Sequence, residues 1–240
     1  MRQSLVDKYT GKIEKFRAMV NACSPRDHVN IRSILLWLHA RRKGANTKTK
    51  LVPISALSDW VYDAEGGMIR YKRNEGYFFS VYGLTVEHAT DREVTRWNQP
   101  ILVQKEGGVL VILSQKRDGF IKFLLRARYE PGNIHDIQLG PTIQATQSNL
   151  KQHHAGKKPL FSKYINHPKT TIIYSAKHNE EGGRFWRKSN TNILLFLDSK
   201  EKIRANNEDG FIWLTLPEIK KLMLCDHVVN PFVKTVLSPL

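Results

Sequence analysis

A region of alternating apolar runs and turn-forming dipeptides between positions 77 and 129 most strongly limits how this chain can fold. Short runs of β-branched and aromatic residues are separated there by Gly107-Gly108 and Asp118-Gly119. Gly-Gly and Asp-Gly are typical of tight turns that join antiparallel strands. The region therefore predicts a β-meander, with strands at residues 101–105, 109–115 and 120–129.

The segments on either side predict helices and further strands. Apolar residues recur at helical spacing within residues 33–43, and residues 170–177 and 192–198 are apolar enough to form two buried strands. Thr215, followed three residues later by Glu218, has the pattern of a capped helix. The predicted fold class is therefore α+β, with a mixed sheet between helices. We expect residues 1–60 to form a helical segment that packs on a main body of residues 61–240.

Charge and composition narrow the class of partner. The 240 residues carry a formal net charge of +16, which favours a phosphorylated or polyanionic partner. No helix-turn-helix pattern, zinc-finger spacing or RNP-type motif accompanies this charge, so nucleic acid is not the expected partner.

No signal peptide is recognisable and no apolar run approaches the roughly 20 residues of a membrane span, so we expect a cytoplasmic protein without membrane contact. The separation of Cys23 from Cys225 predicts neither a disulfide framework nor a zinc site.

Six blocks of sequence stand out along the chain: GYFFSVYGL (76–84), RWNQPIL (96–102), EPGNIHDIQLGPTIQATQSN (130–149), EEGGRFWRKSNTN (180–192), FIWLTLPEI (211–219) and VNPFVKTVLS (229–238). In this order they resemble the NDP-hexose 2,3-dehydratase family of deoxysugar and antibiotic biosynthesis. The resemblance implies a Nudix-like fold and a 4-keto-6-deoxyhexose substrate linked to a nucleoside diphosphate, with dTDP expected. It also implies loss of water across C2 and C3 to give a 3,4-diketo-2,6-dideoxy sugar, without a cofactor.

The resemblance has consequences for assembly as well. Members of the family are usually about twice as long, with two homologous modules, so a chain that supplies one module is expected to form a homodimer. The product is expected to pass to a downstream 3-ketoreductase. The glutamate cluster of the Nudix metal signature is absent, so no metal site is expected.

Six positions depart from the family pattern. They are Arg73 in place of His, Arg128 in place of Lys, Gly140 in place of Ser, and Ser189, Thr191 and Lys234 in place of Arg. These changes leave open an alternative function, in which a diverged relative binds a nucleotide sugar or another phosphorylated metabolite but performs different chemistry.

Residues 130–149 hold many short amide and hydroxyl side chains, which suit a ligand that presents hydroxyls and phosphate oxygens. Glu130 follows directly on an apolar strand, where partial burial would raise the pKa of its carboxyl group toward that of a useful general base. The residues alone favour a turn at Pro131-Gly132-Asn133, with Glu130 bonded to loop amides, whereas the resemblance favours the site. The residues expected to bind substrate here are Arg128, Asn133, Gln138, Thr142, Gln144, Ser148 and Asn149.

The block at residues 180–192 combines paired glycines with basic side chains, which suits a diphosphate because guanidinium groups match phosphate oxygens. The expected ligands of the substrate here are Arg184, Arg187, Lys188 and Asn190, although a charged surface loop is an equally good interpretation of the residues alone. Glu181 is a candidate catalytic carboxylate, but Glu180 and Glu181 are better explained as counter-ions of the arginines.

Several aromatic residues complete the set of candidates. Tyr164 is a candidate acid at the ketone of the sugar. Trp97, Phe78 and Phe79 are candidates to stack on a base, although packing in a core is the commoner role for aromatic residues in strands.

Overall fold

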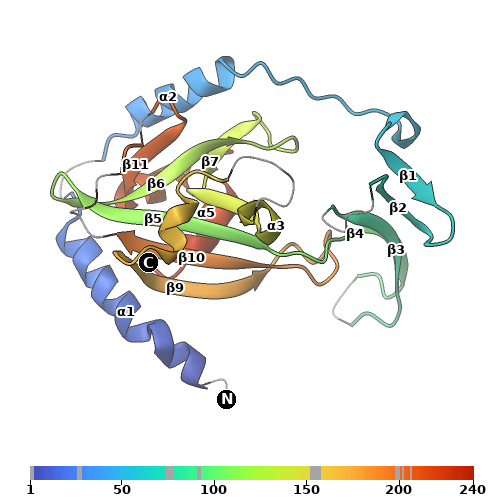
Figure 1. The fold of residues 1–240 in the computed structure, drawn as a ribbon, viewed down its shortest axis with the longest axis horizontal. Helices are drawn as coiled ribbons and strands as arrows, with labels where there is room; N and C mark the ends of the chain where they lie inside the picture. The colour runs from blue at the N-terminus through green and yellow to red at the C-terminus, as the bar shows by residue number, and fades with distance from the viewer. Residues whose placement is uncertain are drawn as a thin grey trace.

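The computed structural model describes residues 3–25, 29–73, 78–90, 93–151, 158–197, 201, 203–205 and 207–240, with side chains described from residue 8 onward. Within these residues the strands form a large mixed sheet and a separate four-stranded sheet. Figure 1 shows the four-stranded sheet to one side of the large sheet, at the end of a long connection from α2 (Arg32–Lys43) that includes the short 3₁₀ helix η1 (Ile54–Ala56). The predicted α+β fold class is confirmed.

The large sheet is built around β5 (Gly108–Arg117) and β6 (Phe120–Tyr129), which are antiparallel and joined at Asp118-Gly119. Both turn residues have positive φ, 51° and 83°, as a tight Asp-Gly turn requires. β10 (Ser189–Leu197) runs parallel to β5 and antiparallel to β9 (Thr170–Asn179), and β11 (Phe211–Thr215) completes the far edge beside β6. The predicted Asp-Gly turn and both predicted strands are therefore confirmed. Of the two strands, β10 is buried as predicted, whereas β9 lies at the edge of the sheet and Ile173 is its one buried residue, so the predicted burial of residues 170–177 is wrong.

Both faces of the large sheet are covered, and β5 shows this most clearly. Leu110 and Ile112 belong to one core cluster, whereas Val109, Val111 and Leu113 belong to the other. Successive side chains of a strand point to opposite faces, so a continuous apolar run is what a strand between two cores needs.

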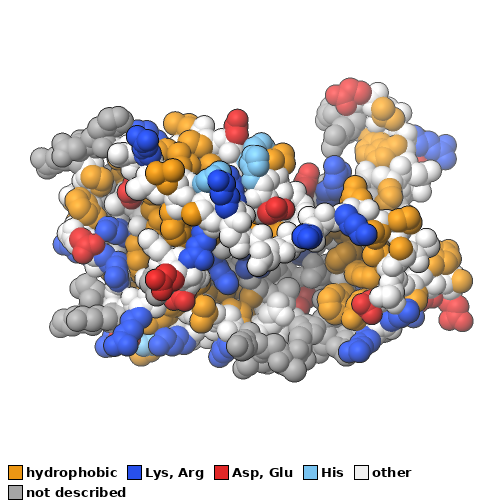
Figure 2. Space-filling model, turned by 90° about the horizontal axis from the view of Figure 1, so that it is seen from above, with side chains coloured by type: hydrophobic (Ala, Val, Ile, Leu, Met, Phe, Trp, Pro, Cys, Tyr) orange, Lys and Arg blue, Asp and Glu red, His pale blue; other side chains and the backbone are white. Residues whose placement is uncertain are grey.

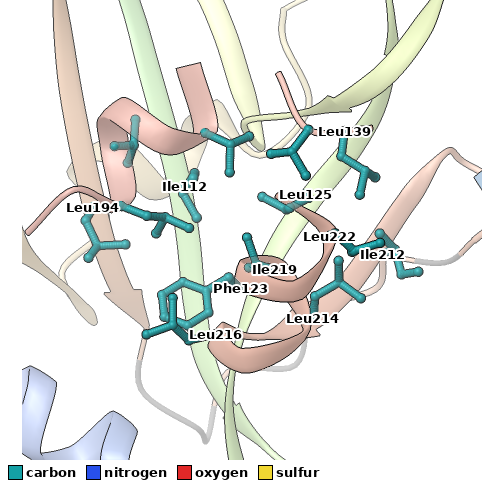
Figure 3. Close-up of a cluster of buried hydrophobic side chains, with 14 of the residues drawn as sticks. Ile112, Phe123, Leu125, Leu139, Leu194, Ile212, Leu214, Leu216, Ile219 and Leu222 are labelled. Atoms are coloured by element: carbon teal, nitrogen blue, oxygen red, sulfur yellow. The ribbon is translucent and has the colours of Figure 1, made fainter. Parts of the chain in front are cut away.

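The first core is covered by helices. These are α1 (Gln3–Ala22), α2 (Arg32–Lys43), α4 (Leu216–Leu222) and α5 (Pro231–Leu237), which contribute Phe16, Leu38, Ile219 and Val233 among other residues. Figure 3 shows Ile112, Phe123, Leu125 and Leu194 of the sheet facing Leu216, Ile219 and Leu222 of α4. The second core is covered in part by η2 (Ser162–Asn166), through Tyr164 and Ile165.

β5 and β6 separate beyond Leu113 and Leu124, and a hairpin fills the gap between them. β7 (Ile137–Gly140) pairs with β6, and β8 (Ile143–Thr146) pairs with β5. Thr142 lies at the point of separation, where its hydroxyl accepts a hydrogen bond from Leu113 N at 3.0 Å and donates one to Leu124 O. The segment 130–149 is therefore built into the sheet.

The smaller sheet is an antiparallel series of β1 (Trp60–Asp63), β2 (Met68–Tyr71), β3 (Ser80–Val86) and β4 (Trp97–Val103). The prediction that residues 101–105 join the meander of β5 and β6 is therefore wrong. Gly107-Gly108 is a close approach to β10: a Cβ atom on Gly107 would lie 2.2 Å from Ser189 O, and one on Gly108 would lie 2.8 Å from Asn190 Oδ1.

The loop between β9 and β10 attaches to the smaller sheet. Leu102 N donates to Arg184 O at 2.9 Å, and Trp186 N donates to Leu102 O at 2.8 Å. Gln99 Nε2 donates to Gly183 O at 2.8 Å. The two sheets are thus joined by this loop as well as by the connection from β4 to β5.

The capped helix predicted at Thr215 is confirmed in α4. Thr215 N donates to Glu218 Oε2 at 2.7 Å, and Glu218 N donates to Thr215 Oγ1 at 3.5 Å. We expect Thr215→Ala to lower the free energy of unfolding by about 1 kcal/mol, because a helix-end donor loses its acceptor. Urea unfolding measures this. In the control Thr235→Ala, an exposed hydroxyl that donates to Pro231 O is removed, and a loss as large as that at Thr215 would contradict the capping role.

Candidate functional site

Three pockets follow one another along the connection from β4 to β5. We name them by their chemistry: a carboxylate pocket of about 250 Å³, a cationic pocket of about 310 Å³ and an aromatic pocket of about 220 Å³. The carboxylate and cationic pockets share Gln104, Gly108 and Lys188, and the cationic and aromatic pockets share Lys105. The connection from β4 to β5 therefore contributes lining residues to all three pockets.

The carboxylate pocket draws its walls from strands far apart in sequence. It is lined by Gln104, Gly108, Leu110, Arg128, Gln144, Ala145, Thr146, Asn149, Glu180, Lys188, Asn190 and Phe232. Five of the predicted substrate-binding residues are in this set: Arg128, Gln144, Asn149, Lys188 and Asn190. The fold thus brings the block at 130–149 and the block at 180–192 to one pocket.

Glu130 lies behind two of the lining residues and is held from three sides. Gln144 Nε2 donates to Glu130 Oε1 at 2.6 Å, and Asn230 Nδ2 donates to Glu130 Oε2 at 3.1 Å. Arg128 Nε forms an ion pair with Oε1 at 3.6 Å, which is too long for a hydrogen bond. The Glu130 side chain remains 27% exposed. These contacts hold the carboxylate in one orientation.

Asn230 is a contact of Glu130 that sequence reasoning missed. Its Oδ1 accepts a hydrogen bond from Phe232 N at 2.9 Å as the N-cap of α5, while its amide nitrogen reaches Glu130. The Asn230-Pro231 pair is a recognisable helix start, but only the fold shows that this helix begins beside Glu130.

Arg128 is the cation of this cluster. Burial lowers the pKa of its guanidinium group, and the charge of Glu130 acts in the opposite direction. Arginine keeps its proton throughout the physiological range, so a cation lines the carboxylate pocket. Gly140, another departure from the family pattern, lies beside it: a Cβ atom there would be 3.5 Å from Arg128 Cβ. Two of the departures are therefore neighbours.

A second carboxylate, Glu180, lines the same pocket. Its Oε2 forms an ion pair with Lys188 Nζ at 3.2 Å and accepts a hydrogen bond from Asn190 Nδ2. Asn190 Oδ1 in turn accepts from Gly108 N at 2.8 Å. The Glu180 and Lys188 side chains are only 13% and 12% exposed. Glu180 is thus a counter-ion of Lys188 and not of an arginine as expected, and it is also part of the pocket, which was not expected.

The cationic pocket is rich in positive charge. It is lined by Gln104, Lys105, Gly107, Gly108, Gln147, Lys177, Arg187, Lys188, Ser189 and Thr191. Among the described residues, those lining it include four cations and no Asp or Glu, so it suits an anion such as a diphosphate. Lys105 and Lys177 were missed, because isolated lysines in strands and loops carry no recognisable motif.

Other predicted residues have structural contacts. Asn133 closes the turn after Glu130, donating from Nδ2 to Asp136 O at 3.3 Å. Gln138 is buried in β7, and Thr142 is buried between β5 and β6. The Ser148 hydroxyl donates to Glu106 Oε2 at 2.6 Å. None of these four residues lines the carboxylate or the cationic pocket.

The remaining candidates lie elsewhere. Tyr164 is 3% exposed and packs in the second core. Glu181 and Arg184 are exposed, and neither lines the carboxylate or the cationic pocket. Trp97 is in β4, where its Nε1 donates to Gln99 Oε1 at 2.8 Å. Gly76 and Tyr77 of the first block lie outside the described residues.

The remaining family departures fall in different places. Arg73 lines the aromatic pocket, Ser189 and Thr191 line the cationic pocket, and Lys234 is exposed on α5. On the face seen in Figure 2, Lys and Arg side chains are interspersed with uncharged and acidic ones and do not form one continuous basic stripe.

The described residues offer neither a metal-ligand cluster nor a membrane-spanning helix. In the part of the chain that the structure describes, no group of three or more His, Cys, Asp and Glu residues could hold a metal ion. None of the helices in the same ranges has the length and apolar character needed to cross a membrane.

Comparison with known proteins identifies relatives. A family model described as NDP-hexose 2,3-dehydratase matches residues 31–240. Proteins named dTDP-4-dehydro-6-deoxy-alpha-D-glucopyranose 2,3-dehydratase are similar: the one from Saccharopolyspora spinosa is 36% identical over 84% of this chain, and the one from Amycolatopsis orientalis is 33% identical over 88%. The chain spans 40% and 45% of their respective lengths.

Solved structures resemble the chain more distantly. An Ap4A hydrolase from C. elegans is 14% identical, with a TM-score of 0.35, and covers 56% of this chain with 94% of its own. The NUDIX domain of Shewanella oneidensis NrtR, complexed with ADP ribose, is 13% identical, with a TM-score of 0.31, and covers 54% of this chain with 82% of its own.

Proposed function

Since this chain belongs to the NDP-hexose 2,3-dehydratase family, we propose that it removes water across C2 and C3 of a dTDP-linked 4-keto-6-deoxyhexose, a step of deoxysugar biosynthesis. The observation that carries this proposal is the carboxylate pocket, at which two carboxylate–cation pairs meet. Arg128, the partner of Glu130, lines it together with both members of the pair Glu180–Lys188.

The reaction needs a base and a stabilised enolate. The C3 proton is acidified by the neighbouring C4 carbonyl, and its removal forms an enolate from which the C2 hydroxyl leaves as water after taking up a proton. The resulting C3 enol then becomes a ketone as C2 gains a proton, so one molecule of water is lost and nothing is oxidised. Arg128 and Lys188 are cations of the pocket that would stabilise the enolate oxygen.

We assign the base to Glu130. Its side chain is 27% exposed, against 13% for Glu180, and it keeps a longer distance from its cation, 3.6 Å against 3.2 Å. Glu130 is thus the less enclosed of the two carboxylates and the one less closely paired with a cation. Glu180 then holds Lys188 in place. This proposal gives Tyr164 and Glu181 no catalytic role.

We further propose that the cationic pocket binds the diphosphate. Lys105, Lys177, Arg187 and Lys188 converge there, and Lys188 also lines the carboxylate pocket. A diphosphate joined to the sugar must lie directly beside it, as these two pockets do. Gln144 and Asn149 would then contact the hydroxyls of the sugar, while Asn190, which is bonded to Glu180 and Gly108, would hold the wall of the pocket in place.

The test is to incubate the purified chain with dTDP-4-keto-6-deoxyglucose in deuterated solvent, with a reductant to trap the unstable diketone. Mass spectrometry is expected to show loss of water with solvent deuterium at C2 of the trapped product, and exchange of the C3 proton for deuterium in the unreacted substrate. Binding without either change would favour the alternative, a diverged relative with different chemistry, to which the adjoining departures at Arg128 and Gly140 point. Stabilisation by nucleic acid and not by dTDP would contradict both functions.

We expect activity to survive exhaustive treatment with a chelator, because the enolate can be stabilised by Arg128 and Lys188 and the described residues offer no metal-ligand cluster. The measurement is turnover before and after EDTA. Loss of activity that magnesium restores would contradict this expectation.

We propose that the chain forms a homodimer, and that its product passes to a 3-ketoreductase. The chain covers less than half of relatives that act as longer chains, and a two-fold pair would supply a comparable assembly. Light scattering at micromolar concentration is expected to give twice the mass of the chain. A fully active monomer would contradict the dimer.

A further inference from the structure

The aromatic pocket lies on the smaller sheet. It is lined by Met68, Arg70, Tyr71, Arg73, Phe78, Phe79, Ser80, Tyr82, Val103 and Lys105. The rings of Tyr71 and Phe78 pack against each other, tilted by 35° with centroids 4.3 Å apart, and the ring centroid of Phe79 lies 4.8 Å from that of Trp60. Phe78 is nevertheless 47% exposed.

Core packing accounts poorly for this cluster. Among the described residues of β1–β4, Ile101 alone is buried, so the smaller sheet does not enclose a core of its own. An exposed aromatic surface around a pocket marks a binding site more often than a packing element.

We propose that the aromatic pocket holds the nucleobase of the nucleoside diphosphate. This inference rests on the proposed function, because it assigns the third part of the same substrate. The order of the pockets carries it. Lys105 lines both the aromatic and the cationic pocket, and Lys188 lines both the cationic and the carboxylate pocket. A base, a diphosphate and a sugar follow one another in a nucleotide sugar in the same order.

The chemistry of the lining suits a planar base with carbonyl oxygens. Phe78 and Tyr71 line the pocket with aromatic rings, and a base can pack against this pair, because stacking is sequence-tolerant and every base has a π-face. Arg70 is held in place by Asp63, with Nε to Oδ2 at 2.6 Å, and supplies guanidinium donors at the pocket wall. Ser80 and Tyr82 add hydroxyl groups.

Methionine methyl resonances provide a direct test. The chain has four methionines. Met68 lines the aromatic pocket, whereas Met19 and Met223 pack against the first core, the one that the helices cover. With ¹³C-methyl methionine in the full chain, saturating dTDP is expected to shift the Met68 signal through the ring current of the base. Inorganic pyrophosphate should leave it nearly unmoved, and Met68→Leu assigns the signal. A Met68 signal that dTDP does not move would overturn the proposal.

Affinity provides a second test that separates base from diphosphate. Phe78→Ala is expected to raise the Kd for dTDP by about 5- to 150-fold, the equivalent of one lost stacking contact, without changing the Kd for pyrophosphate. Tyr62→Ala is the control, because Tyr62 is an exposed aromatic residue of the same sheet that does not line the pocket. It should change neither constant.

The outcomes also distinguish this inference from the proposed function. If dTDP binds the parent no more tightly than pyrophosphate does, the base pocket is wrong while the diphosphate assignment stands. If neither ligand binds the parent, both proposals fail. Unchanged pyrophosphate binding by Phe78→Ala shows that the variant is folded, and if it does not fold, Phe78→Leu and the Met68 signal decide.

Discussion

Replacing Glu130 with Gln is expected to lower turnover by about 10²–10⁴-fold while leaving the affinity for the nucleotide sugar almost unchanged, the result typical of a lost general base. The amide keeps the shape of the carboxylate and an oxygen that can still accept from Gln144 or Asn230. It cannot take the C3 proton. Exchange of that proton with deuterated solvent measures the step directly, and the Kd for dTDP serves as the binding control.

The matched variant is Glu180→Gln, because Glu180 is the other carboxylate bonded to a cation and an amide around the pocket. The Gln side chain lacks the negative charge that pairs with Lys188, so Lys188 is no longer held in place. We therefore expect weaker binding of the diphosphate, together with a smaller loss of C3-proton exchange than in Glu130→Gln. If Glu180→Gln abolishes exchange and Glu130→Gln retains the parent rate, the base is Glu180. If Glu130→Gln is unfolded, the role of Glu130 is to hold the turn at residues 131–136 and α5 together.

Replacing Gly107 with Ala should lower the free energy of unfolding by about 1–3 kcal/mol, the range for overpacking a well-packed region. The same change should distort the wall of the pockets. The added Cβ atom would lie 2.2 Å from Ser189 O, which is backbone of β10 and has no flexible side chain to move. The connection from β4 to β5 must then shift away from β10. Thermal unfolding and dTDP affinity measure the two effects.

Gly132→Ala is the control for this prediction, since a Cβ atom there meets nothing within 4 Å. It should leave unfolding and binding close to those of the parent protein. A Gly107→Ala variant as stable as Gly132→Ala would show that the connection does not pass as close to β10 as the fold implies.

The sequence predicted elements whose signal is local. Residues 109–115 and 120–129 are strands because continuous apolar runs suit a sheet covered on both faces, and Asp118-Gly119 joins them because that dipeptide adopts the turn at low cost. The helix after Thr215 could be predicted because its cap lies within three residues. The family resemblance, which rests on ordered blocks, is confirmed by the family model.

The pairing of elements could not be predicted in the same way. Residues 101–105 have a strand pattern, but periodicity reports burial and not the identity of the neighbouring strand. β4 therefore looked like a partner of β5, although it pairs with β3. Gly107-Gly108 was interpreted as a turn because a glycine needed for close approach looks the same in sequence as one needed for a turn.

The same distinction, between local signals and the pairing of distant segments, applies to the candidate site. By itself the sequence determined β5, β6, β9 and β10 and the helices α2 and α4, where polar residues gather in the blocks at 130–149 and 180–192, and the family to which the chain belongs. Only the tertiary structure decided that Glu130 meets Asn230, one hundred positions away, and that Thr142 closes a gap between strands instead of lining a pocket. Such contacts depend on which segments the core brings together. The free energy of packing that decides this is a sum over the whole fold, so it cannot be estimated from any short stretch of sequence.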